Sequence, residues 1–151
     1  MYFNHHLCLF HQDAASQEDI FRTMAARLQD EGCVKDTFLD AASEREQEYP
    51  TGILFENTGF AIPHTDSKHV NESQICFASL KRPIPFASMV DKNDTVDVEL
   101  VFMLAMAKPH EQVETLQNLM ALFQDQDAVK KLKECSTEQE FNDILKTREI
   151  Y

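Results

Sequence analysis

The chain has 151 residues, of which 43% are hydrophobic, and it carries 14 basic against 26 acidic side chains for a formal charge of -12. This length suits one domain with its own hydrophobic core, without disulfides or a structural metal. An acidic chain without a basic run is a poor match for a nucleic-acid backbone or an anionic membrane, so we expect neither as a partner.

The cysteines and the amino-terminal segment favour a cytoplasmic location. Cys8, Cys33, Cys76 and Cys135 are widely spaced and match no metal-binding or redox motif. No segment approaches the roughly 18 apolar residues that cross a bilayer, and the amino terminus lacks the basic and apolar regions of a signal peptide. We therefore expect a reducing compartment and no direct membrane insertion.

In chain order, the first predicted elements are a strand and two helices, over 2–10, 17–30 and 37–46. Residues 16–19 read Ser-Gln-Glu-Asp, which resembles a capping box at the start of the first helix. Pro50 stops the second helix, because proline does not continue a helical hydrogen-bond pattern. Arg45 is therefore expected close to the segment that follows.

Short apolar runs predict the strands of the middle third, over 53–55, 60–62, 74–80 and 97–104. Asn57 and Gly59 favour a turn over 56–59 between the first two of these strands. The proline-containing segment 82–85 and the polar segment 91–94 are expected to be loops. Helical spacing then predicts three further helices, over 112–123, 128–134 and 138–146. The expected fold is α/β, with a mixed five-stranded sheet flanked by helices on both faces in a single domain over 1–151.

His64 is the first candidate for chemistry. The predicted strand that precedes it ends in Pro63, which places the imidazole at the carboxyl edge of the sheet. A side chain at that edge is held by the strand yet can face a ligand. On position alone, a surface histidine without a function is the stronger hypothesis.

The residues around His64 reverse that preference, because they resemble the mannitol/fructose class of IIA components of the bacterial phosphoenolpyruvate-dependent sugar phosphotransferase system. The matching residues are Arg45-Glu46, Thr51-Gly52-Ile53, Gly59 and Ala61-Ile62-Pro63-His64. The resemblance covers the whole chain, and the segment 44–53 looks most like the galactitol-type branch. The chain departs from the pattern at Thr65, where most members carry a small residue, often glycine.

The resemblance implies a phosphotransferase component that accepts a phosphoryl group from the phosphocarrier protein HPr on His64. It also implies delivery of that group to a cysteine of a IIB component, which serves a membrane IIC permease. A neutral imidazole nitrogen is a competent nucleophile near pH 7. Arg45 is then expected to stabilise charge on the transferring group. No nucleotide or magnesium motif is visible, so we expect no cofactor and no metal.

Many relatives use a second histidine near the start of the helix that follows the last strand. Gln112 stands at that position here, and His110 falls two residues earlier. Either Gln112 acts as a neutral amide donor to the phosphate, or His110 reaches in from the loop before the helix. We favour Gln112, because a two-residue shift turns a side chain by about 200° around a helix. Backbone N–H groups at this helix start are further candidate phosphate donors.

Three alternatives remain. His5, His6 and His11 resemble a metal cluster, but His5 and His6 would point to opposite faces of the strand over 2–10, which argues against metal binding. A phosphorylation-dependent regulatory module, linked to nitrogen control or to a transcription regulator, would keep the same histidine as a transport component. A structural scaffold with a silent histidine would require the signature to have arisen without use.

Overall fold

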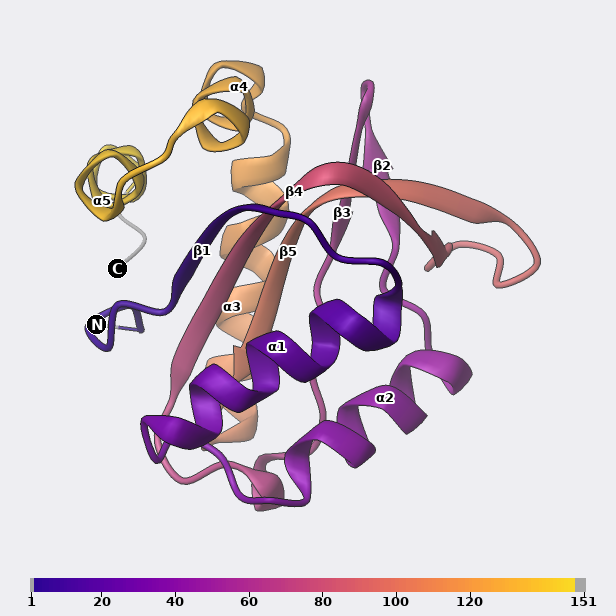
Figure 1. Ribbon diagram of the computed structural model, residues 1–151, viewed down its shortest axis with the longest axis vertical. Coiled ribbons are helices and arrows are strands. Elements are labelled where there is room, and N and C mark those ends of the chain that lie inside the picture. Colours follow the sequence, from indigo (N-terminus) through magenta and orange to yellow (C-terminus); the bar gives the residue numbers. More distant parts are fainter. Residues whose placement is uncertain (1, 149–151) are drawn as a thin grey trace.

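A mixed five-stranded sheet runs through the centre of the computed structural model, which describes residues 2–148 (Figure 1). Across the sheet the strands are ordered β1 (Cys8–Gln12), β4 (Gln74–Ala87), β5 (Thr95–Ala105), β3 (Thr58–Ala61) and β2 (Ile53–Phe55). The pairs β1–β4 and β3–β5 are parallel, whereas β4–β5 and β2–β3 are antiparallel. β4 and β5 are the long central strands; β1 pairs with β4, β3 pairs with β5, and β2 extends the sheet by pairing with β3.

Helices cover both faces of this sheet (Figure 1). One face packs against α1 (Gln17–Asp30) and α2 (Phe38–Glu48), and the other packs against α3 (Pro109–Phe123), α4 (Gln126–Glu134) and α5 (Glu138–Lys146). Because strand side chains alternate, Cys76 and Ala78 of β4 enter the first core while Ile75 and Phe77 enter the second. A short 3₁₀ helix, η1 (Ser67–His69), lies before β4. The predicted fold class is confirmed.

The capping box at the start of α1 forms as the sequence indicates. The Ser16 hydroxyl accepts the Asp19 N–H at 3.2 Å, and the Asp19 carboxylate accepts the Ala15 N–H at 3.0 Å. The first bond satisfies a donor that a helix start leaves without a partner, and the second holds the residue that precedes the N-cap. Within residues 2–148, no helix combines the length and the apolar character needed to cross a bilayer.

The prediction of a strand over 2–10 is wrong in its first half. Residues 2–5 form a turn, His6 has a φ of 59°, and β1 begins only at Cys8. The apolar pattern arises because Phe3 and Leu7 are buried although the backbone between them turns. Burial of a side chain and pairing of its backbone in a sheet are separate properties. The apolar residues of this segment indicate burial, but they do not show that its backbone forms a strand.

The argument that placed His5 and His6 on opposite faces of a strand fails for the same reason. His5 instead contacts two carboxylates, with Nδ1 3.1 Å from Glu31 and Nε2 2.6 Å from Glu72. The His6 ring lies 2.5 Å from the carboxylate of Glu138. The contacts of both rings with carboxylates therefore attach the amino-terminal segment to the rest of the domain.

The prediction of a loop over 82–85 is also wrong, because β4 continues to Ala87. Proline lacks an N–H and is tolerated where one side of a strand has no partner. β1 pairs with β4 only as far as Leu80, so in the described part of the chain the proline-containing residues 82–85 have no strand beside them on the side of β1. A register shift between Ser79 and Ile84 absorbs this irregularity.

Gly59 belongs to β3 rather than to the turn predicted over 56–59. The turn is made by Glu56, which has a φ of 54°, and Asn57. A Cβ at residue 59 would lie 2.0 Å from the carbonyl oxygen of Asp97 on β5, so only glycine allows these backbones to approach.

Candidate functional site

His64 lines a cleft of about 510 Å³ built from segments that are distant in sequence. Arg45 comes from the last turn of α2, the loop 88–92 follows β4, and Leu116 comes from α3. The structure therefore brings together the two residues that the sequence singled out for phosphoryl chemistry, Arg45 and His64.

The backbone just before His64 is fixed by hydrogen bonds outside the regular sheet. β3 ends at Ala61, and the N–H of Ile62 donates to the hydroxyl of Thr51 at 3.1 Å. Pro63 has no N–H to satisfy, and its carbonyl accepts the Leu104 N–H at 2.9 Å. His64 thus leaves the sheet from a main chain that is held on both sides.

The imidazole of His64 is oriented by the same segment. Its Nδ1 lies 2.6 Å from the carbonyl oxygen of Ile62. A carbonyl oxygen only accepts, so Nδ1 carries the proton and Nε2 carries the free lone pair. The side chain is 8% exposed, which leaves it reachable only through the cleft.

The electrostatic surroundings keep this imidazole neutral. Burial lowers the pKa of His64 below its ordinary value of 6.5, and the positive charge of Arg45 lowers it further. The hydrogen bond to Ile62 and the charge of Asp66 act in the opposite direction without reversing the shift. A neutral ring with its lone pair on Nε2 is the form that can attack phosphorus.

Arg45 provides a cation whose donors are not committed to the protein. Its Nε is buried without a hydrogen-bond partner, and no carboxylate forms an ion pair with it, within residues 2–148. Its guanidinium carbon lies 5.3 Å from the centre of the Tyr49 ring, a cation–π contact that holds the side chain. A guanidinium in this state is suited to the planar, multidentate recognition of a phosphoryl group.

The side of the cleft opposite α2 is formed by the loop 88–92. Sequence reasoning did not identify this loop as part of the site, because it lies far along the chain from Arg45 and His64. Gly52 ties the two walls together: its N–H donates to Ala87 at 3.1 Å and its carbonyl accepts the Met89 N–H at 2.7 Å. Met89 and Val90 are exposed, Val90 by 90%, and both line the cleft with Tyr49. Two apolar residues directly before the polar turn 91–94 were the only signal in the sequence.

The start of α3 corrects one part of the sequence interpretation. The helix begins at Pro109 rather than at 112, since proline fits the first helical position, so His110 lies in the helix and not in a preceding loop. His110 is exposed, Gln112 is partly buried, and neither lines the cleft, whereas Leu116 does. Glu111 in this first turn accepts hydrogen bonds from Tyr2 and Ser73.

None of the four cysteines lines the cleft. Burial raises the pKa of Cys8 to about 12 and those of Cys33 and Cys135 to about 11, and it also raises that of Cys76. These side chains are therefore neutral thiols at pH 7 rather than nucleophilic thiolates. Among the described residues, no group of three or more His, Cys, Asp or Glu side chains is arranged to hold a metal ion.

Comparison with known proteins identifies the family of the chain. Residues 1–148 match the family described as the phosphoenolpyruvate-dependent sugar phosphotransferase system, EIIA 2. The chain is 37% identical over 101 residues to the galactitol-specific EIIA component of Escherichia coli K12, an alignment that covers 67% of each chain. It is 32% identical over 113 residues to the fructose-specific EIIA component of Haloferax volcanii, covering 74% of this chain and 69% of the relative.

Solved structures share the fold at lower sequence identity. One is the complex of enzyme IIA and phosphorylated enzyme IIB for mannitol from Escherichia coli, which matches with a TM-score of 0.75 and 19% identity. This match covers 93% of the present chain and 94% of the other. The arrangement of sheet and helices is therefore common to both molecules.

Proposed function

Because the chain belongs to the EIIA type 2 family of the phosphoenolpyruvate-dependent sugar phosphotransferase system, we propose that His64 is the residue on which it carries a phosphoryl group. The observation that supports this assignment best is the tautomer of His64. Its Nδ1 is occupied by the Ile62 carbonyl, which leaves the lone pair on Nε2, and Arg45 lines the same cleft. A phosphoryl group bound in this cleft could therefore contact both the imidazole of His64 and the guanidinium of Arg45.

The proposed reaction consists of two transfers through one nitrogen. Nε2 of His64 attacks the phosphorus of phosphorylated HPr, forming an N–P bond as the bond to HPr breaks. A thiolate of a IIB component then attacks the same phosphorus, and the N–P electrons return to Nε2. Nδ1 keeps its proton throughout, so no proton has to leave His64. Arg45 offsets the charge on the phosphoryl oxygens in both steps.

The rim of the cleft supports a protein partner as the source and the destination of the phosphoryl group. Tyr49, Met89 and Val90 are exposed apolar side chains around the buried His64. Exposed apolar residues grouped around a reactive centre are typical of protein contact sites. We assign this rim to docking of HPr and of a IIB component, which in turn serves a membrane IIC permease, and we place the chain in the cytoplasm with both.

We further propose galactitol as the polyol whose uptake this component serves. The relative at 37% identity is galactitol-specific, whereas the fructose-specific and ascorbate-specific relatives are 32% identical over their alignments. Thr65, at which the chain departs from the usual pattern, is buried and lines a neighbouring hollow with Arg45 and Tyr49. The sugar itself is expected to contact only the membrane component.

The decisive experiment follows the phosphoryl group by intact mass. The purified chain is incubated with enzyme I, HPr and phosphoenolpyruvate, and an acid-labile gain of one phosphoryl group is expected. His64→Ala should abolish this gain and remain folded, because one histidine contributes little to the core. His69→Ala is the matched control and should be labelled normally. Acid-labile labelling of His64→Ala would show that another residue carries the group.

The second half of the experiment tests the partner and the substrate. IIB components of the galactitol, fructose and ascorbate systems are each mixed with the phosphorylated chain, and loss of its label is timed. The galactitol IIB should be phosphorylated fastest. A faster reaction with another IIB would change the substrate assignment, and a stable label with all three would favour the regulatory function over transport.

A further inference from the structure

The carboxylate of Glu46 is buried next to Thr51, which lines the cleft together with His64. Glu46 is 4% exposed and Thr51 is 4% exposed, so both are shielded from water. The carboxylate accepts the Thr51 N–H at 2.7 Å and the Thr51 hydroxyl at 2.9 Å. Within residues 2–148, no basic side chain forms an ion pair with Glu46. Thr51 is therefore the hydrogen-bonding partner of Glu46. It also connects Glu46 to the segment that carries His64, because its hydroxyl accepts the N–H of Ile62.

The direction of these hydrogen bonds is set by the groups that form them. The single hydroxyl proton of Thr51 is directed to Glu46, which leaves lone pairs on Oγ1 for the Ile62 N–H at 3.1 Å. The carbonyl oxygen of Ile62 in turn accepts Nδ1–H of His64 at 2.6 Å. The series of hydrogen bonds therefore runs from Nδ1 of His64 through Ile62 and Thr51, and it ends at the carboxylate of Glu46.

We propose that Glu46 and Thr51 are positioning residues for phosphoryl transfer, acting through Ile62 to hold the imidazole of His64 with its proton on Nδ1. The inference rests on the proposed role of His64 and adds the residues that prepare it. Ile62 lies beyond the last residue of β3, so the sheet does not hold its N–H; the hydroxyl of Thr51 does. If Ile62 turned, its carbonyl would no longer meet Nδ1, and the lone pair would not be confined to Nε2.

The charge of Glu46 is not explained by stability alone. Burial raises the pKa of this carboxyl above 4.5, and the hydrogen bonds from Thr51 and the charge of Arg45 only oppose that shift. A raised folded-state pKa favours folding below the unfolded pKa, and that benefit is lost as the pH rises through the folded pKa. Burial thus makes the charged form of Glu46 less favourable in the folded protein, whereas its acceptor oxygens orient Thr51.

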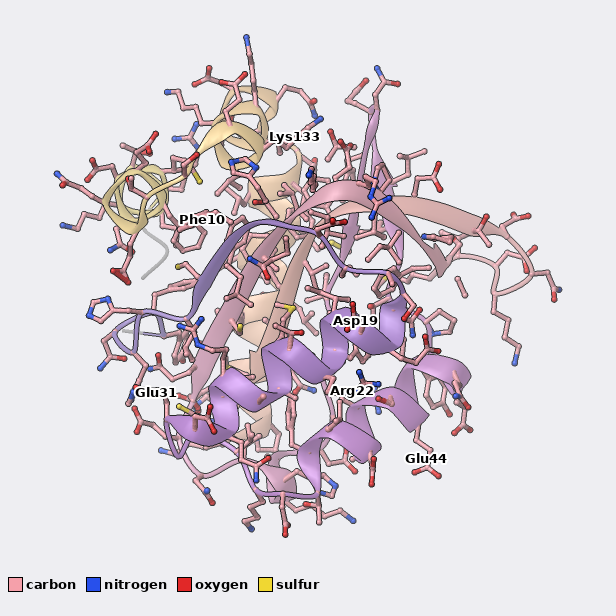
Figure 2. All side chains as sticks on the ribbon, in the orientation of Figure 1. Phe10, Asp19, Arg22, Glu31, Glu44 and Lys133 are labelled. Atoms are coloured by element: carbon pink, nitrogen blue, oxygen red, sulfur yellow. The ribbon has the colours of Figure 1, made fainter. Side chains whose placement is uncertain are left out.

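Two pairs of substitutions test the proposal. Thr51→Val removes the hydroxyl and keeps the shape, while Thr51→Ser keeps the hydroxyl. Glu46→Gln removes the charge and places an amide N–H donor next to the N–H and hydroxyl donors of Thr51. Its matched control is Glu44→Gln, which changes the same residue type on α2 at a side chain that projects from the helix into solvent (Figure 2).

The first measurement is the tautomer of His64 in the unphosphorylated chain, read from the ¹⁵N shifts of its ring by NMR. This signature does not depend on phosphoryl transfer, so it separates failure of this inference from failure of the proposed function. The unmodified chain, Thr51→Ser and Glu44→Gln should show the proton on Nδ1. Thr51→Val and Glu46→Gln should show a mixture of both tautomers.

The second measurement is the single-turnover rate of phosphorylation by HPr. Thr51→Val and Glu46→Gln should slow it by roughly tenfold or more, as loss of a supporting hydrogen bond does at comparable sites, while the two controls stay within about twofold. Melting curves establish whether each variant is folded. If Thr51→Val does not fold, Glu46→Gln alone tests the proposal. An unchanged tautomer and rate in a folded Thr51→Val or Glu46→Gln would overturn the proposal.

Discussion

Nδ1 of His64 lies 2.6 Å from the carbonyl oxygen of Ile62, so the imidazole is held by the main chain of its own segment. The contact places the proton on one nitrogen and the lone pair on the other. It also makes the orientation of the ring depend on how the end of β3 is anchored. The predictions below follow from this arrangement and from the residues around it.

The first prediction concerns pH. Burial lowers the pKa of His64 below 6.5, so the ring stays neutral between that lower pKa and pH 6.5, where an ordinary histidine is largely protonated. Acceptance of the phosphoryl group should therefore persist as the pH falls below 6.5. An NMR titration of His64 and the rate of phosphorylation should show the same midpoint. A ring that titrates at or above 6.5 would contradict the inferred environment.

The second prediction concerns Arg45. Arg45→Ala should slow phosphorylation of His64 by about 100-fold or more, the range found when one preorganised donor is removed from a developing charge. Arg45→Lys should recover part of the rate, because lysine supplies the charge without the planar array of donors. Rapid-quench kinetics with HPr measure both variants.

The control for Arg45 is Arg22 on α1, which is exposed and pairs with Asp19 within its own helix. Figure 2 shows Arg22 and Asp19 on α1, and the cleft contains neither of them. Arg22→Ala should leave the rate unchanged. A similar loss in both variants would point to net charge rather than to a contact with the phosphoryl group.

The third prediction separates Gln112 from His110. Residues four apart share a helix face, so Gln112 lies on the side of α3 that carries Leu116 into the cleft, whereas His110 is turned away and exposed. Gln112→Ala should slow single-turnover transfer about three- to tenfold, which corresponds to one neutral hydrogen bond. His110→Ala should have no effect in the same assay, with native melting for both. The reverse order would assign the role to His110.

The fourth prediction is that no cysteine of this chain takes part in transfer. Replacing Cys8, Cys33, Cys76 or Cys135 by serine should leave phosphorylation intact, because burial keeps all four as neutral thiols outside the cleft. Cys76→Ser should lower the free energy of unfolding by about 1–3 kcal/mol, the cost of burying a hydroxyl. Denaturant unfolding and intact mass measure the two effects. Loss of transfer in a folded variant would contradict the prediction.

Local sequence patterns were sufficient to predict the features that depend on near neighbours in the chain. Helical spacing and the capping box at Ser16 predicted α1 because a helix is stabilised by contacts three and four residues apart. The residues around His64 indicated the family, and with it the chemistry. The helix order and the mixed sheet followed from the same local patterns.

Contacts between residues far apart in the chain could be identified only from the folded structure. The continuation of β4 through its prolines depends on where β1 stops pairing, and the turn before β1 depends on the packing of Phe3 and Leu7. The loop 88–92 is held near His64 by the backbone hydrogen bonds of Gly52. Glu46 is connected to the segment of His64 by its hydrogen bonds with Thr51. Contacts of this kind join residues far apart in the chain, and they depend on burial and geometry, which the local spacing of residue types does not encode.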